Sequence, residues 1–162
     1  GVVFKMKKLL LVVVPLLLLL VGCTSAPEKE TSLEIVEVEI TLPENVKEEE
    51  KVAVKTLVTQ GEEKVEDAKE VQLEIWNVEK GKENSVLLNA EHVGEGVYEV
   101  KHSFQEKGVY RVQSHVTARD MHVMPTKQLV VGDMSQEEVD AILEGEVEEE
   151  EHGDSVDSGH HH

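Results

Sequence analysis

Apolar and polar side chains alternate strictly along residues 109–117, and this pattern constrains the fold more than any other feature of the chain. One face carries Tyr110, Val112, Ser114 and Val116, and the other carries Arg111, Gln113, His115 and Thr117. A period of two residues with strong β-forming side chains indicates a strand with one buried face. We therefore expect His115 on the solvent-facing side or rim of this strand.

Short apolar stretches of the same kind recur along the chain, with turn signals between them. The expected strands cover residues 33–42, 51–59, 71–76, 86–91, 97–104 and 126–131. Their spacing of about 8–12 residues is typical of an antiparallel sandwich. The sequence thus predicts an all-β fold, an immunoglobulin-like antiparallel β-sandwich of about seven strands over residues 33–132. Tyr98 and Tyr110 each follow a turn, where a hydroxyl can bond to loop backbone as in a tyrosine corner.

The pattern changes after Gly132. Ser135 and Glu138 have the spacing of a capping box, and the apolar residues that follow recur at helical intervals. We expect region 133–162 to hold a short amphipathic helix over residues 136–144 and then a disordered acidic and histidine-containing tail. We expect the sandwich to be complete without this helix. His160, His161 and His162 are either native or the remnant of a purification tag.

Residues 1–22 have the pattern of a signal peptide, with translation expected to start at Met6. Basic residues precede an apolar run over residues 9–21, which is shorter than the roughly 20 residues that a membrane-spanning helix needs. Leu20-Val21-Gly22-Cys23 resembles the lipobox of bacterial lipoproteins. Cleavage there would leave Cys23 as a lipid-carrying N-terminus.

That lipid anchor would be followed by a flexible tether over residues 23–32. The expected location is then the extracytoplasmic face of the cell membrane. An ordinary signal peptide or an uncleaved anchor is the alternative. Cys23 is the only cysteine of the chain, so the sequence offers no disulfide within it.

Charge and motifs narrow the function further. The formal net charge is −18, which repels phosphate backbones and argues against a nucleic-acid partner. The sequence has no HExxH zinc motif, phosphate-binding glycine loop or GxSxG elbow. We therefore expect a binding module and not an enzyme.

Soft metal ligands gather between the last two expected strands. The sequence predicts that residues 118–124 form a loop standing off the sheet, which carries Met121, His122 and Met124 close to His115. On an extended run, His122 and Met124 share one face. Thioether and imidazole groups together favour Cu(I), so these four residues are the candidate metal ligands. The alternative is that the methionines pack under the loop and the histidines are only solvated.

Three stretches carry a resemblance to a known family. They are VEDAKEVQLEIW at residues 65–76, GVYEV at 96–100 and HVTARDMHVMP at 115–125. They resemble the YtkA-like domain of small bacterial lipoproteins over about residues 33–132. His122-Val123-Met124 also matches the His-x-Met end of some extracytoplasmic copper chaperones.

The resemblance implies an immunoglobulin-like domain outside the membrane, with copper handling suggested by kinship to domains of copper-transport proteins. A copper-transport or oxidase-assembly protein would then be the partner. Two functions stay open at this point. One is copper binding or delivery through the His/Met segment, and the other is a structural or protein-interaction lipoprotein of the cell envelope without a metal site.

Overall fold

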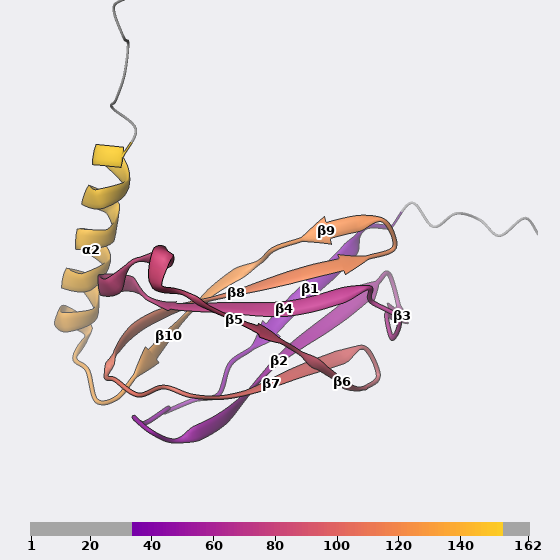
Figure 1. Cartoon of the computed structure of the whole chain (residues 1–162), viewed down its shortest axis with the longest axis horizontal. Helices are drawn as coiled ribbons and strands as arrows, with labels where there is room; N and C mark the ends of the chain where they lie inside the picture. The colour runs from indigo at the N-terminus through magenta and orange to yellow at the C-terminus, as the bar shows by residue number, and fades with distance from the viewer. Residues whose placement is uncertain (1–33, 154–162) are drawn as a thin grey trace, which may run out of the picture. The chain divides into compact units, whose positions relative to one another are not determined.

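A computed structural model describes the backbone of residues 34–153 and the side chains of residues 34–147. Within that range two antiparallel sheets pack face to face as a sandwich, and one helix follows them (Figure 1). The predicted all-β sandwich is confirmed. The expected signal peptide, Cys23, the tether and His160, His161 and His162 lie outside the described residues.

The first sheet has the order β1-β2-β7-β6, and the short β3 also pairs with β2. Its strands are β1 (Val36–Thr41), β2 (Lys51–Gln60), β3 (Glu63–Lys64), β6 (Glu91–Gly94) and β7 (Val97–Ser103). The first strand is shorter than its apolar stretch, because Ile35 is 66% exposed and precedes the ladder.

The second sheet has the order β10-β8-β4-β5, and β9 also pairs with β8. Its strands are β4 (Glu70–Asn77), β5 (Val86–Asn89), β8 (Gly108–Ala118), β9 (Met121–Val123) and β10 (Thr126–Val131). Two short 3-10 helices, η2 (Val78–Lys80) and η3 (Lys82–Asn84), join β4 to β5. The burial of β8 alternates as its sequence predicts, with His115 on the outward face.

The core lies between the two sheets and consists of aliphatic side chains with a few aromatic rings. Leu73, Val54 and Val112 are fully buried there. The buried hydroxyls of Thr56 on β2 and Ser114 on β8 lie 3.2 Å apart and bond each other across the core. A buried polar group costs free energy unless it has a partner, so this pair fixes how the two central strands face each other.

Both predicted tyrosine corners are present. The hydroxyl of Tyr98 donates to the carbonyl oxygen of Val65 at 3.0 Å and accepts from the amide of Ala68 at 3.1 Å. The hydroxyl of Tyr110 donates to the carbonyl oxygen of Glu106 at 2.8 Å. Each tyrosine therefore holds a connecting loop against the sandwich.

The expected loop over residues 118–124 is wrong, because a tight hairpin replaces it. Strand β8 continues to Ala118, Arg119 and Asp120 turn with φ values of 50° and 62°, and β9 starts at Met121. Positive φ at both central residues is the geometry of a two-residue hairpin turn, which matches the twist of the flanking strands. His115, Met121 and His122 accordingly lie on paired strands, and Met124 directly follows β9.

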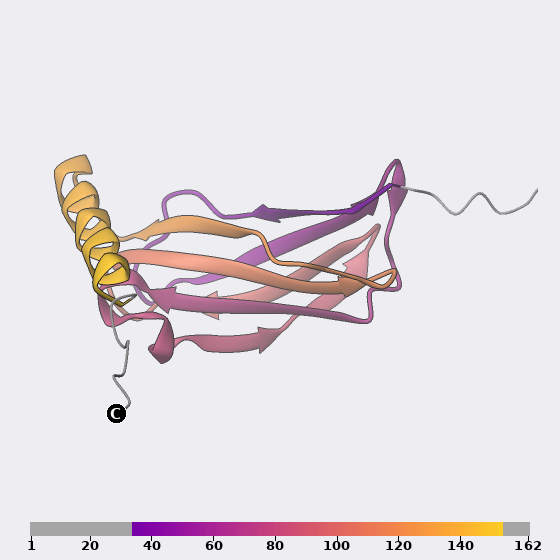
Figure 2. The same cartoon turned by 90° about the horizontal axis from the view of Figure 1, so that it is seen from above.

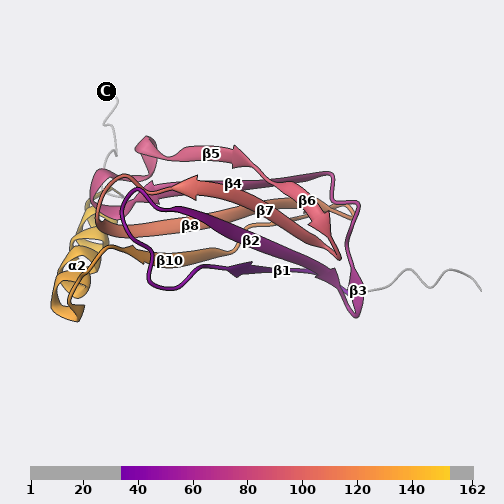
Figure 3. The same ribbon diagram turned by 90° about the horizontal axis from the view of Figure 1, so that it is seen from below.

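The expected single strand over residues 86–91 is also divided. Strand β5 belongs to the second sheet, Ala90 follows it, and β6 belongs to the first sheet. Figure 3 shows the chain continuing from β5 into β6 as it passes between the sheets. The outer strand of the first sheet therefore begins only after this crossing.

Helix α2 (Gln136–Gly153) lies across one end of the strands (Figure 2). The predicted capping box is confirmed, with Ser135 N donating to Glu138 Oε2 at 2.8 Å and Glu138 N donating to Ser135 Oγ at 3.2 Å. The helix continues past the predicted end at residue 144 into the acidic stretch that was expected to be disordered. Part of the reason is the ion pair of Glu146 with Arg111 of β8, at 2.6 Å.

The apolar face of α2 is covered as well. Val139 is 5% exposed and forms a small cluster with Val78 and Val109, against which Met134, Ile142 and Leu143 pack. Because Val109 points outward from β8, the helix shields an apolar position that the second sheet leaves uncovered. Within the described part of the chain, no helix is long and apolar enough to cross a lipid bilayer.

Candidate metal centre

The β-ladder brings Met124 opposite His115. Strand β9 pairs with β8 in the same register as β10 does, with Val123 opposite Val116 and Thr126 opposite Gln113. Counting through the two residues between β9 and β10 puts Met124 across from His115. The amide of Ser114 also bonds to the carbonyl oxygen of Pro125 at 3.0 Å, in agreement with that register. Residues directly opposite each other share a face with Cβ atoms about 5 Å apart.

His122 completes this group from the diagonal position. It pairs with Thr117 in the ladder, so it lies on the same face as His115, two residues along. The centroids of the His115 and His122 rings are 6.1 Å apart, with 42° between the ring planes. An imidazole nitrogen binds a metal ion at about 2 Å, so one ion fits between two rings at this separation.

Each histidine has one ring nitrogen bonded to a protein side chain. His115 Nε2 lies 2.9 Å from Glu74 Oε2, and His122 Nδ1 lies 2.9 Å from Thr117 Oγ1. When these nitrogens carry the protons, Nδ1 of His115 and Nε2 of His122 hold the free lone pairs. A carboxylate only accepts, so a partner such as Glu74 fixes the tautomer and orientation of a metal-binding histidine, whereas the Thr117 hydroxyl holds the orientation of His122 and is able to donate or accept.

Glu74 on β4 is itself well held. Its carboxylate accepts from Ser85 Oγ at 2.8 Å and lies 3.7 Å from Lys82 Nζ. Burial opposes ionisation of Glu74, but the hydrogen bonds of His115 and Ser85 and the charge of Lys82 outweigh it and lower the pKa of the carboxyl. The carboxylate is therefore ionised near neutral pH, where it can accept the His115 proton.

Met121 has a different place from the other candidates. Its sulfur accepts a hydrogen bond from the amide of Val36 at 3.3 Å, and its side chain packs against a buried cluster at the edge of the core. Met124 in contrast is 49% exposed. The structure thus brings His115, His122 and Met124 together on the outer face, while Met121 closes the sandwich beside β1.

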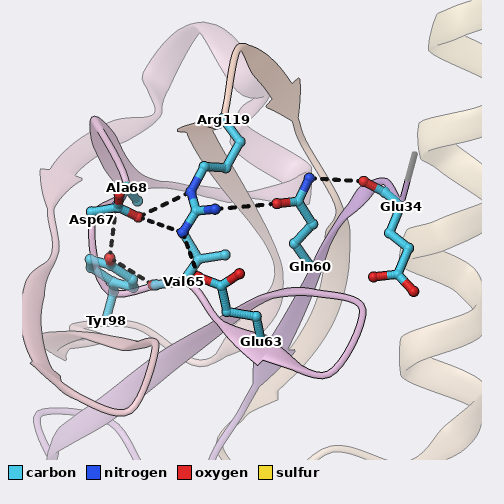
Figure 4. A network of polar contacts seen from close by, with 8 residues as sticks. All are labelled: Glu34, Gln60, Glu63, Val65, Asp67, Ala68, Tyr98 and Arg119. Atoms are coloured by element: carbon cyan, nitrogen blue, oxygen red, sulfur yellow. Dashed lines mark hydrogen bonds and ion pairs between the residues drawn. The ribbon is translucent and has the colours of Figure 1, made fainter. Parts of the chain in front are cut away.

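The turn that carries this segment is fixed by Arg119, as Figure 4 shows. The guanidinium donates to Glu63 Oε1 at 2.8 Å, to Asp67 Oδ1 at 3.1 and 3.2 Å and to Gln60 Oε1 at 3.4 Å. These residues belong to β3, β2 and the loop before β4. The hairpin of β8 and β9 is therefore tied to the neighbouring connections at the same end of the sandwich.

Glu74 and Thr117 are the residues of this group that the sequence did not single out. Both alternate with buried neighbours, so their outward direction is readable from the sequence, but their pairing with the histidines depends on the register of β4 and β9 against β8. Among the described side chains of residues 34–147 there is no cluster of three or more His, Cys, Asp or Glu side chains that could hold a metal ion. The candidate centre consists of two imidazoles and one thioether.

The sequence model of the YtkA-like family matches residues 30–115, which is more than half of the chain. The chain belongs to the YtkA-like family. The match ends at His115, so His122 and Met124 lie beyond it. The YtkA-like family suggests an extracytoplasmic binding or interaction module.

Other comparisons are more distant. No curated protein matches the chain. A family 76 glycoside hydrolase from a bovine Bacteroides thetaiotaomicron strain has 16% identity and a TM-score of 0.34, covering 59% of this chain and 19% of its own. The PKD domain of human VPS10 domain-containing receptor SorCS2 has 15% identity and a TM-score of 0.34, covering 71% of this chain and 94% of its own.

Proposed function

We propose that this YtkA-like protein binds copper on the outer face of its second sheet and delivers it to another protein. His115 Nδ1, His122 Nε2 and the sulfur of Met124 are the proposed ligands. The observation that carries the proposal is the pair of histidine rings 6.1 Å apart, each with its opposite nitrogen bonded to Glu74 or Thr117. Met121 is left out of the ligand set, because its sulfur is engaged by Val36.

The donor set selects among metals. A thioether is a soft ligand that favours Cu(I), whereas imidazole alone suits Cu(II) or Zn(II). Two imidazoles and one thioether leave one side of the ion open to solvent. An ion held in this way can be passed to an incoming ligand of a partner without unfolding the site.

The proposed location follows from the N-terminal sequence. A lipid on Cys23 would hold the domain at the extracytoplasmic face of the cell membrane, since two acyl chains anchor a protein stably where one does not. Copper-transport or oxidase-assembly proteins are the proposed partners. If copper does not bind, the protein is instead a structural or interaction lipoprotein of the cell envelope.

A titration of the full-length protein in mild detergent with Cu(I), against a competing chelator and without oxygen, tests this function. All variants carry alanine at positions 160, 161 and 162, so that the terminal histidines contribute nothing. We expect H122A and M124L each to weaken Cu(I) binding by at least about tenfold, because each removes one of three ligands. E74Q should weaken it by about tenfold through the outer partner of His115.

The matched control is M121L, which makes the same change as M124L three residues away. It should leave Cu(I) affinity unchanged, because the Met121 sulfur lies against Val36. Far-UV circular dichroism checks that each variant is folded. Equal Cu(I) affinity of H122A and the parent protein would contradict the proposal and leave the interaction module as the function.

A further inference from the structure

The two long sides of the sandwich are closed to different extents. Along the β1 side, Lys127 Nζ of β10 donates to the carbonyl oxygen of Ile40 at 2.6 Å, and Met121 of β9 contacts Val36 at 3.3 Å. The opposite side is formed by β5 and β6, which are one segment of chain that changes sheets at Ala90. Because β6 starts only after this crossing, it covers only part of β7.

Strand β7 therefore keeps a free edge within the described part of the chain. Its pairing with β6 ends at Glu99, opposite Glu91, whereas its pairing with β2 continues to Ser103. Residues 100–103 thus have a ladder partner on one side only. A free strand edge presents unpaired amide and carbonyl groups and is a template for another extended segment.

A cavity opens beside this edge, between the start of β5 and the end of β7. Its volume is about 330 Å³, and its walls include Ile75, Trp76, Phe104 and Tyr110. Val86 also lines it and shows that the core is incomplete here. Val86 lies opposite Ile75 in the ladder and faces inward with it, yet Val86 is 43% exposed and Ile75 only 2%.

Polar groups surround the cavity on the β7 side. His102 lies at an inward-facing position of β7 with its ring edge-on to Phe104, at a centroid separation of 4.8 Å. Burial lowers the pKa of His102, so the imidazole is neutral at neutral pH and fits an apolar surrounding. Lys80 and Glu106, which form an ion pair, also line the cavity.

We propose that the free edge of β7 and the adjacent cavity bind an extended segment of a partner protein. The segment adds as a strand beside residues 100–103 and inserts one large apolar side chain between Val86 and Phe104. Strand addition takes affinity from main-chain hydrogen bonds and specificity from side-chain pockets. A cavity of about 330 Å³ is at the small end of ligand sites and suits one side chain better than a whole cofactor.

The net charge of this chain indicates which charges the partner segment should carry. The chain has a formal net charge of −18, so basic residues on either side of the apolar anchor favour association and acidic ones oppose it. The docking site does not include His115, His122 or Met124. It stands independently of the copper proposal.

Binding of short peptides to the full-length protein in mild detergent tests the docking site. The probes are acetylated Lys-Thr-Val-Phe-Val-Thr-Lys amide and the same peptide with glycine in place of phenylalanine. Trp76 alternates with inward-facing Ile75 on β4, and Lys82 Nζ lies 5.0 Å from the centre of its ring, so isothermal titration calorimetry is used to measure peptide binding. We expect the phenylalanine peptide to bind at least about tenfold more tightly than the glycine peptide.

Two variants on neighbouring residues separate the cavity from the general surface. V86F fills the cavity and should abolish binding of the phenylalanine peptide, whereas L87F changes a residue that is 55% exposed on the other face of β5 and should leave binding unchanged. Hydrogen exchange should show new protection of amides within residues 100–103 when the phenylalanine peptide is bound.

Each other outcome overturns the proposal. No binding of either peptide, or an equal loss of binding in V86F and L87F, would show that the cavity is not a docking site. Equal binding of N-acetyl-phenylalaninamide without amide protection would make it a small-molecule pocket. Association of the protein with itself that V86F abolishes would make a second copy of this chain the occupant.

Discussion

The two ends of β8 are held in the sandwich by different kinds of contact. At its start, outward-facing Val109 is covered by Val139 of α2 and by Val78, in a cluster of apolar side chains. At its other end, Arg119 and Tyr98 make hydrogen bonds and ion pairs with loop residues around Val65 and Asp67, as drawn in Figure 4. On the outer face of the sheet, the start of β8 is thus covered by apolar side chains, with the Arg111–Glu146 ion pair beside them. At the other end the turn is held by polar contacts, while Val116 and Ala118 on the inner face are buried.

The difference explains where the candidate metal centre can lie. The side chains that face α2 are apolar or engaged in the Arg111–Glu146 ion pair, so this face is a poor place for a metal ion. The polar end fixes the hairpin through its turn residues and leaves the outward side chains of β8 and β9 open. His115 and His122 belong to this open part of the same sheet face.

The largest effect is expected from a charge placed in the apolar contact. V139D should lower the free energy of unfolding by about 2–4 kcal/mol, because it either buries a carboxylate or detaches α2 and exposes Val109. Urea unfolding followed by circular dichroism measures the change. Because only the helix end is affected, the response to Cu(I) should remain that of the parent protein at low urea.

The matched control for the helix is E137A, since Glu137 is exposed on the same first turn. It should change the free energy of unfolding by no more than about 0.5 kcal/mol. Equal stability of V139D and E137A would show that α2 contributes nothing to the fold. It would also agree with the expectation that the sandwich is complete at Gly132.

An intermediate effect is expected at the polar end. Y98F removes one hydroxyl and leaves the Ala68 amide and the Val65 carbonyl oxygen without their partner, which should cost about 1–2 kcal/mol. Y110F is the comparison, since Tyr110 makes a single bond to Glu106. It should cost less than Y98F in the same urea experiment, and the reverse order would show that the Tyr98 corner is not the one that holds the loops.

Local sequence patterns were enough to predict the sheet architecture and the helix start. The alternation in β8, the Tyr110 corner and the capping box of Ser135 and Glu138 depend on residues close together in the chain. The partners of Tyr98 are about 30 residues away in sequence, and only the position of Tyr98 after a turn was readable locally. Hydrophobic periodicity and turn chemistry report such features directly. The extension of α2 was missed, because its acidic end is held by Arg111 of a distant strand.

The arrangement of the candidate site was harder to predict, because it depends on register. The sequence shows that His122 and Met124 share a face. It does not show that Met124 lies across from His115, or that Glu74 of β4 bonds to His115. The hairpin was missed because Arg119 and Asp120 are not the usual Asn-Gly or Asp-Gly turn pair. Bonds from Arg119 to Asp67 and Glu63 hold this turn. No local sequence pattern predicts these bonds.

The smallest effect is expected from R119A, because its partners Glu63 and Asp67 are largely exposed and water screens such pairs. We expect little change in the urea midpoint of unfolding. The amides of β9 should exchange hydrogen faster, because the bonds from the turn to Glu63 and Asp67 are lost. Salt at about 1 M should speed the hydrogen exchange of the same β9 amides in the parent protein, because the Debye length is then about 3 Å.

K127A offers a comparison, because Lys127 of β10 donates to the backbone carbonyl oxygen of Ile40 in β1, away from the turn between β8 and β9. Faster exchange that spreads to β4 or β7 in R119A would mean that the polar end is part of the global fold, and the contrast between the two ends of β8 would be lost.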